Sequence, residues 1–234
     1  MAPRKIALVT GANKGIGFEI ARQLTEADVE VIVGARSQER GMTAADAIGA
    51  QFVQLDVNDE ASAADAASSV ERDYGRLDIL VNNAGVLHEL HRPLPSETPM
   101  EIVRRTYATN VFGVIVVTNA FLPLLRRSPA GRIVNLSSRF SSLTRALEPG
   151  RMILLAYNSS KTALNAVTLQ YANELRETPI KINIVDPGHC ATDINGRTGE
   201  RTAAEAARLP VQFALLPNEG PTGSFVSEEG VVPW

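Results

Sequence analysis

The feature that most restricts the fold of this 234-residue chain is a regular alternation of short aliphatic runs with longer amphipathic segments. The runs are aliphatic and β-branched throughout, which is typical of strands buried on both faces of a parallel sheet. Strands are predicted at 6–9, 29–33, 52–55, 79–81, 133–134 and 180–185, with a short seventh at 225–226. Helices are predicted around Ile16, Ile20 and Leu24, whose spacing places them on one buried face, and at 37–48, 59–74, 99–125 and 157–177.

This order of segments predicts the fold class. Strand–helix–strand units with right-handed crossovers build an open parallel sheet with helices on both faces. The sequence contains no solenoid-type repeat and no linker long enough to divide the chain. We therefore predict an α/β fold in a single domain over residues 1–234, with a Rossmann-type doubly wound sheet.

Composition limits the partners and the compartment. The formal net charge of −3 gives no basic surface for nucleic acid or an anionic membrane. The longest uncharged apolar stretch, 111–125, is too short to span a bilayer. The single cysteine, Cys190, and an N-terminus without a signal-peptide pattern fit a reducing compartment. We expect a cytoplasmic protein with neither a nucleic-acid nor a membrane partner.

A glycine-rich turn joins the first strand to the first helix. Gly11 permits a tight turn, Gly15 lets the backbone approach a pyrophosphate, and Gly17 allows the helix to pack closely on the strand. The helix N-terminus offers unpaired N–H groups and a positive dipole end to phosphate. The alternative is a glycine-rich loop that binds nothing. The predicted cofactor contacts here are Gly11, Asn13, Lys14, Gly15, Ile16 and Gly17.

The end of the second strand indicates which dinucleotide is bound. NAD sites place an Asp or Glu there to accept from the ribose 2′-hydroxyl, but this chain reads Val33-Gly34-Ala35-Arg36 and has no acid. Arg36, with Lys14 from the glycine turn, would instead hold a 2′-phosphate. The alternative is that Arg36 is a solvated charge. We predict NADP(H) as the cofactor in preference to NAD(H).

Tyr157 and Lys161 lie four residues apart at the start of a predicted helix, so they share one helix face. A free tyrosine titrates near pH ~10 and exchanges protons poorly at neutral pH. An ammonium ~4 Å away at an effective dielectric of ~20 stabilises the phenolate by ~4 kcal/mol, so Lys161 is expected to lower the pKa of Tyr157. The alternative is a buried aromatic ring beside a surface lysine.

Taken together, these motifs resemble the short-chain dehydrogenase/reductase family, and the C-terminal tail is similar to that of its carbonyl reductases. The resemblance covers most of the chain. It is carried by the motifs Thr10–Gly17, Asp56-Val57, Asn82-Asn83-Ala84-Gly85, Asn110, Ser137-Ser138, Tyr157 with Lys161, and Pro187-Gly188 with Thr192.

The resemblance implies four catalytic residues. Tyr157 would be the general acid in carbonyl reduction, and Lys161 would bind the nicotinamide ribose. Ser138 would hydrogen-bond the substrate oxygen, with Ser137 as the alternative serine. Asn110 would hold a water that links Lys161 to solvent.

The resemblance also implies further cofactor contacts. Asp56 would accept from the adenine amino group, and the Val57 N–H would donate to the adenine ring. The remaining contacts, along the cofactor and on its nicotinamide side, are Asn83, Ala84, Gly85, Pro187, Gly188 and Thr192. No metal ligands are predicted, because His88 and His91 lack a third partner at suitable spacing.

The chain departs from the family pattern between Ser138 and Tyr157, where the gap is longer than usual. This insertion is expected to rim the substrate pocket, and its apolar side chains favour a moderately apolar carbonyl compound. It is shorter than the insertion of monomeric carbonyl reductases, so we expect a homodimer or homotetramer.

The leading functional hypothesis is an NADPH-dependent reductase that transfers hydride to a ketone or aldehyde. Two other enzymes of the same family stay open: a secondary-alcohol dehydrogenase and a 3-oxoacyl reductase. An alternative from another class is a non-catalytic sensor or scaffold that binds NADP. The intact set of Ser138, Tyr157 and Lys161 argues against that alternative.

Overall fold

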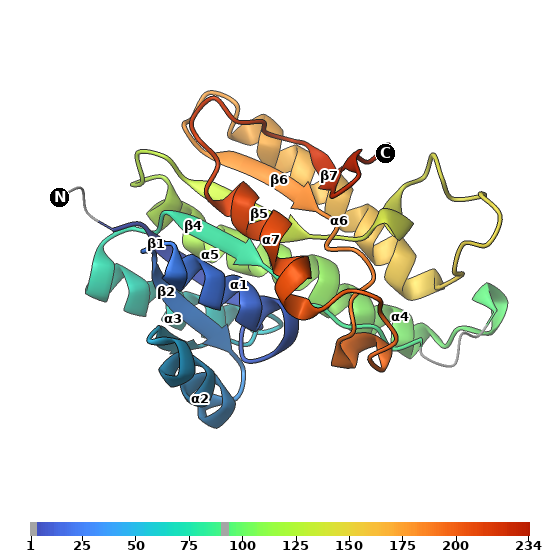
Figure 1. Cartoon of the computed structure of the whole chain (residues 1–234), viewed down its shortest axis with the longest axis horizontal. Coiled ribbons are helices and arrows are strands. Elements are labelled where there is room, and N and C mark those ends of the chain that lie inside the picture. Colours follow the sequence, from blue (N-terminus) through green and yellow to red (C-terminus); the bar gives the residue numbers. More distant parts are fainter. Residues whose placement is uncertain (1–3, 90–93) are drawn as a thin grey trace.

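The computed structural model describes residues 4–89 and 94–234 and shows one continuous eight-stranded sheet (Figure 1). The strand order is β3-β2-β1-β4-β5-β6-β7-β8, and every neighbouring pair is parallel except β7 and β8. The strands are β1 (Ile6–Thr10), β2 (Glu30–Ala35), β3 (Gln51–Gln54), β4 (Ile79–Asn82), β5 (Arg132–Leu136), β6 (Lys181–Val185), β7 (Phe225–Ser227) and β8 (Gly230–Val231). The predicted doubly wound α/β fold is confirmed.

Helices cover both faces of the sheet. They are α1 (Gly15–Glu26), α2 (Gln38–Ile48), α3 (Glu60–Tyr74), α4 (Met100–Tyr107), α5 (Gly113–Leu125), α6 (Leu155–Glu174) and α7 (Ala203–Ala214). Short 3₁₀ turns lie at Pro95–Glu97, Arg139–Ser141 and Asp193–Asn195. The buried residues of α3 and α5 belong to one apolar cluster and those of α1, α2 and α7 to another.

Successive side chains along a strand point to opposite faces of the sheet and so contribute alternately to these two clusters. In β1, Leu8 packs toward α3 and α5, whereas Ala7 and Val9 pack toward α1 and α7. All five residues of β1 are buried. A strand covered on both faces has no polar side to present, which explains the unbroken aliphatic runs of the sequence.

The long helix predicted at 99–125 is interrupted. A π-helical segment, Ala108–Phe112, separates α4 from α5. This stretch, Met100–Leu125, is long and apolar enough to cross a membrane by length and composition, but 61% of its most apolar window is buried inside the fold. Its second half, α5, packs in the core against the sheet and α3.

Two elements were not predicted. Helix α7 begins at a capping box formed by Thr202 and Glu205, but Pro210 in its interior hides its helical pattern. Strand β8 has only two exposed residues and turns back antiparallel to β7.

The assignment of the core can be tested by measuring stability. Leu80 is fully buried in β4, so Leu80→Ala should lower the free energy of unfolding by about 2–5 kcal/mol, as measured by urea denaturation. The matched control is Leu147→Ala, because that leucine is 97% exposed. Equal losses in the two variants would contradict this assignment of the core.

Candidate active site

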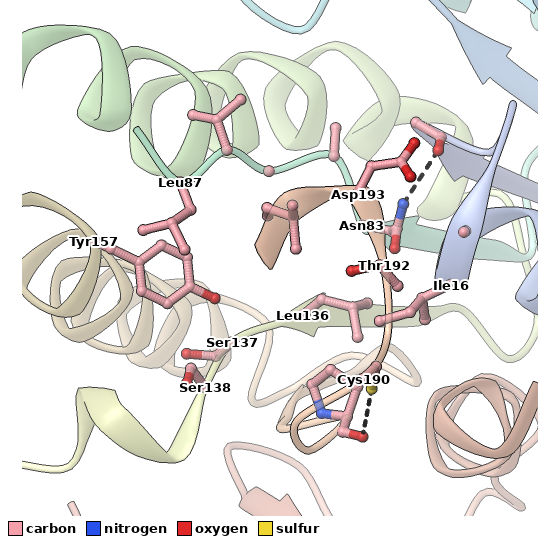
Figure 2. A pocket seen from close by; sticks show the side chains of 18 of the residues that line it. Ile16, Asn83, Leu87, Leu136, Ser137, Ser138, Tyr157, Cys190, Thr192 and Asp193 are labelled. Atoms are coloured by element: carbon pink, nitrogen blue, oxygen red, sulfur yellow. Dashed lines mark hydrogen bonds between the residues drawn. The ribbon is translucent and has the colours of Figure 1, made fainter. Parts of the chain in front are cut away.

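A single large cleft lies where the parallel strands end, with a volume of about 1480 Å³ (Figure 2). Its wall includes nearly every residue that the sequence nominated: Gly11, Asn13, Lys14, Gly15, Ile16, Gly17, Arg36, Asp56, Val57, Asn83, Ala84, Gly85, Ser138, Tyr157, Lys161, Pro187, Gly188 and Thr192. The exception is Asn110, which lies behind the wall. Because the carboxyl ends of parallel strands meet at one edge, motifs far apart in sequence converge here.

The glycine turn is packed tightly against the end of β4. A Cβ added to Gly17 would lie 2.3 Å from Asn83 Nδ2, and one added to Gly11 would lie 3.1 Å from the Cα of Ala84. Asn83 Nδ2 donates to the carbonyl oxygen of Thr10 over 2.8 Å. Gly11 has φ +64°, a left-handed conformation that favours glycine. The glycines are therefore required by sterics as well as by any ligand.

The N-terminus of α1 is suited to an anion. The helix begins at Gly15, and the N-cap residue Lys14 has no side-chain acceptor for the first amides. Gly15, Ile16 and Gly17 line the cleft, so the positive end of the helix lies at its wall.

The two predicted phosphate-binding cations differ in their present partners. Lys14 Nζ forms an ion pair with Asp193 Oδ2 at 2.8 Å, and Arg197 contacts the other oxygen of the same carboxylate at 3.2 Å. These bonds lower the pKa of Asp193. Arg36 is exposed at the end of β2, and its guanidinium has no ion-pair partner within residues 4–89 and 94–234.

Tyr157 occupies the first turn of α6, and its hydroxyl points into the cleft beside the two serines (Figure 2). Lys161 lies one turn further along, with Nζ 5.9 Å from the centre of the Tyr157 ring. This ammonium is 5% exposed and donates to the carbonyl oxygen of Leu136 over 2.7 Å. Serine, tyrosine and lysine thus meet at the end of β5.

The two serines have different partners. Ser137 Oγ is buried and donates to Asn165 Oδ1 over 2.7 Å. Ser138 Oγ instead accepts weakly from the Phe140 N–H at 3.3 Å and lies beside Tyr157 (Figure 2). This geometry favours Ser138 as the serine that would meet a substrate.

Burial sets the protonation of the tyrosine and lysine. It raises the pKa of Tyr157 above its ordinary value, with the Asp186 carboxylate adding to the rise and the Ser138 hydrogen bond opposing it. Burial also lowers the pKa of Lys161 to about 8. The expectation that Lys161 lowers the pKa of Tyr157 is wrong for this structure. Desolvation is the largest cause of the rise in the pKa of Tyr157, and the Lys161 ammonium is bonded to the Leu136 carbonyl oxygen.

Asn110 is fully buried in the π-helical segment, and its side chain is occupied by protein groups. Its Oδ1 accepts from the Val86 N–H at 2.8 Å, and its Nδ2 donates to the Val86 carbonyl at 3.0 Å and to Ser160 Oγ at 3.1 Å. The side chain therefore clamps the loop after β4, and the water-holding role that the resemblance implies for Asn110 stays a prediction.

Sequence reasoning missed several charged residues of the cleft. Asp186 is 3% exposed, accepts from Arg139 Nε at 2.8 Å and bears on the pKa of Tyr157. Its position directly before Pro187 was a usable signal. Glu89 and Asp193 had no such signal, because their partners lie far away in sequence. Among the described residues no group of three potential metal ligands is found, and His91 lies outside them.

Comparison with known proteins agrees with this geometry. Residues 5–203 match the short chain dehydrogenase family. The chain is 34% identical to the NADPH carbonyl reductase 1 of Mus musculus, with 99% of both chains covered. It is 33% identical to (-)-isopiperitenone reductase of Mentha piperita, with 95% of this chain and 96% of the relative covered. That alignment extends over 302 positions, so the relative carries segments that this chain lacks.

A solved structure shows the same architecture. The NADPH-bound carbonyl reductase from chicken fatty liver superimposes with a TM-score of 0.88 at 26% identity, covering 99% of both chains. With the family match over residues 5–203, these similarities establish that the chain belongs to the short-chain dehydrogenase/reductase family of oxidoreductases, among relatives that include carbonyl reductases.

Proposed function

We propose that this protein uses NADPH to reduce a ketone or aldehyde, with Tyr157 donating the proton to the new alkoxide. The observation that carries the proposal is the position of the phenol, which faces the cleft, lies beside Ser138 and has Lys161 one helical turn away. NADPH, when bound, supplies the hydride. Because the pKa of Tyr157 is raised, the tyrosine holds its proton at neutral pH, as a general acid in reduction requires.

Each of the other residues has a role in this proposal. The Ser138 hydroxyl would donate to the substrate oxygen and hold it against the tyrosine. Lys161, charged below its pKa of about 8, would bind ribose hydroxyls and stabilise negative charge at the phenol after proton transfer. Asn110 would act through Val86, by fixing the loop beside them.

The cofactor preference rests on charge at the end of β2. Arg36 is the exposed cation there, and the cleft wall next to it holds Asp56 and Val57 for the adenine. A 2′-phosphate would receive a bidentate pair from the guanidinium, whereas NADH offers no such group. The names of the mouse relative and of the chicken structure both specify NADPH.

The substrate end of the cleft favours a neutral, largely apolar carbonyl compound. Leu87 lies beside the Tyr157 ring, and Met152 and Leu154 also line the wall (Figure 2). The two arginines there are already paired, since Arg139 contacts Asp186 and Glu229, and Arg201 contacts Glu228. This pairing disfavours the anionic carrier of a 3-oxoacyl substrate.

We also propose that the protein is cytoplasmic and forms a homodimer or homotetramer through the faces of α4, α5 and α6. Met100 and Phe112 are exposed apolar side chains on this side of the fold and support such an interface.

Removal of the phenolic hydroxyl tests the mechanism. Tyr157→Phe should lower kcat by about 10²–10⁴-fold in an assay of NADPH oxidation with a panel of carbonyl compounds, because the general acid is lost. NADPH binding, followed by cofactor fluorescence, should be unchanged. Tyr74→Phe on α3 is the matched control and should keep full activity. Turnover that survives in Tyr157→Phe would overturn the mechanism.

The cofactor assignment is tested at Arg36. Arg36→Ala should raise KM for NADPH by about 10- to 10²-fold, which corresponds to a loss of roughly 1.5–3 kcal/mol in charge-assisted bonding. KM for NADH should stay constant, since NADH has no 2′-phosphate. Arg72→Ala, an exposed arginine on α3 outside the cleft, should change neither constant. Equal use of NADH by the unmodified protein would refute the NADP(H) preference.

Tyr157 and Lys161 together predict the pH dependence of reduction. Lys161 loses its proton as the pH rises through about 8, while Tyr157 keeps its proton there because its pKa is raised. We expect kcat/KM to be level at neutral pH and to fall above this value. Lys161→Met should lower kcat/KM at every pH and abolish this break. A break at the same pH in Lys161→Met would assign it to another group.

A further inference from the structure

Glu89 is a buried carboxylate in the cleft wall that the proposed reaction does not use. It is 1% exposed and lies in the loop that begins at Asn83, directly after β4. Burying a carboxylate is costly unless its oxygens accept hydrogen bonds. The partners of Glu89 therefore indicate why a charge is kept at this position.

Both oxygens of Glu89 accept from the first turn of the helix that carries the tyrosine. Oε1 accepts from the Ala156 N–H at 3.0 Å, and Oε2 accepts from the Tyr157 N–H itself at 2.8 Å. Helix α6 begins at Leu155, and its N-cap residue Leu154 has no side-chain acceptor for these amides. Glu89 thus caps α6 from a distant segment, with its negative charge at the positive end of the helix.

The loop that carries Glu89 is anchored a second time. Both backbone groups of Val86 are bonded to the Asn110 side chain, which also reaches Ser160 Oγ on α6. Ser160 Oγ in turn donates to the Tyr157 carbonyl oxygen over 2.7 Å. The loop therefore contacts the first turn of α6 directly through Glu89, at the Ala156 and Tyr157 amides, and indirectly through Asn110, at Ser160.

We propose that Glu89 is a positioning residue for Tyr157, which holds the first turn of α6 so that the phenol points at the reacting carbonyl. The inference rests on the proposed role of Tyr157 as proton donor. A general acid displaced by roughly 1 Å loses about 10²-fold in rate, so a cap on the amide of the tyrosine bears directly on catalysis. Glu89 itself need not touch the substrate.

Two variants at Glu89 remove the helix cap in part and in full. Glu89→Gln keeps one acceptor oxygen but turns an amide NH₂ toward the other N–H, and Glu89→Ala keeps no acceptor. At saturating NADPH, kcat should fall about tenfold in Glu89→Gln and about 10²-fold in Glu89→Ala. The KM and dissociation constant for NADPH should stay constant, because the glycine turn and Arg36 are unchanged. A purely structural cap would not produce this division between kcat and KM.

Amide hydrogen exchange provides a readout that does not depend on turnover. Exchange in the segment 151–160 should be slowest in the unmodified protein, faster in Glu89→Gln and fastest in Glu89→Ala. The control is Asp59→Ala, because Asp59 Oδ1 caps α3 by accepting from the Ala61 N–H at 2.9 Å, and α3 contributes no residue to the cleft. This control loses a comparable cap and should keep its kcat when all variants are assayed well below their unfolding temperatures.

Three results would overturn the inference. Unchanged exchange at 151–160 in Glu89→Ala would show that the carboxylate does not hold the helix. Faster exchange with full kcat would reduce Glu89 to a structural cap. A parallel loss of kcat and NADPH affinity would show that the whole cleft is disturbed. If the unmodified protein reduces no carbonyl compound, the proposed function fails, and the exchange data separate that failure from a failure of the cap.

Discussion

The ammonium of Lys161 is buried at the end of β5, where the carbonyl oxygen of Leu136 accepts from it at 2.7 Å. Desolvation favours the neutral amine and lowers the pKa of Lys161 to about 8, so the cation depends on acceptors of this kind. The same bond ties α6 to the sheet one turn beyond Tyr157. The place of the phenol relative to the sheet, and so to any cofactor lying across the strand ends, follows from this contact.

A second constraint fixes the opposite half of the cleft. The glycine turn and the end of β4 are locked together, because Asn83 donates to Thr10 and fills the space beside Gly17 that a side chain would need. The loop beyond Asn83 then continues to Val86, which Asn110 clamps, and to the cap of α6. The nucleotide half and the tyrosine half of the cleft are thus joined by one short loop, and neither can shift without the other.

Much of this architecture was predictable from the sequence, for identifiable physical reasons. Six of the seven strands that pair in parallel are almost wholly buried, and only the edge strand β3 is partly exposed, so the aliphatic runs carried a strong signal. The motifs at the carboxyl ends of parallel strands had to converge. Helix α7 was missed because Pro210 breaks its pattern, and β8 because two exposed residues make no pattern at all. The raised pKa of Tyr157 was missed because burial comes from tertiary packing, whereas the spacing to Lys161 shows only the nearby charge.

The glycine turn shows how a long-range contact changes a role that was predicted from the sequence. Lys14 counts as a phosphate-binding cation when it is considered alone, but Asp193 from the loop after β6 already holds it at 2.8 Å. A phosphate that binds Lys14 must therefore displace the Asp193 carboxylate. The gain in binding free energy is smaller than it would be for a solvated cation that has no partner to lose. Arg36 has no such competing carboxylate among the described residues, so it can give a 2′-phosphate its full charge-assisted bonding. Discrimination between NADPH and NADH is thus expected to reside in Arg36, while Lys14 and Asp193 hold the loop after β6 against the glycine turn.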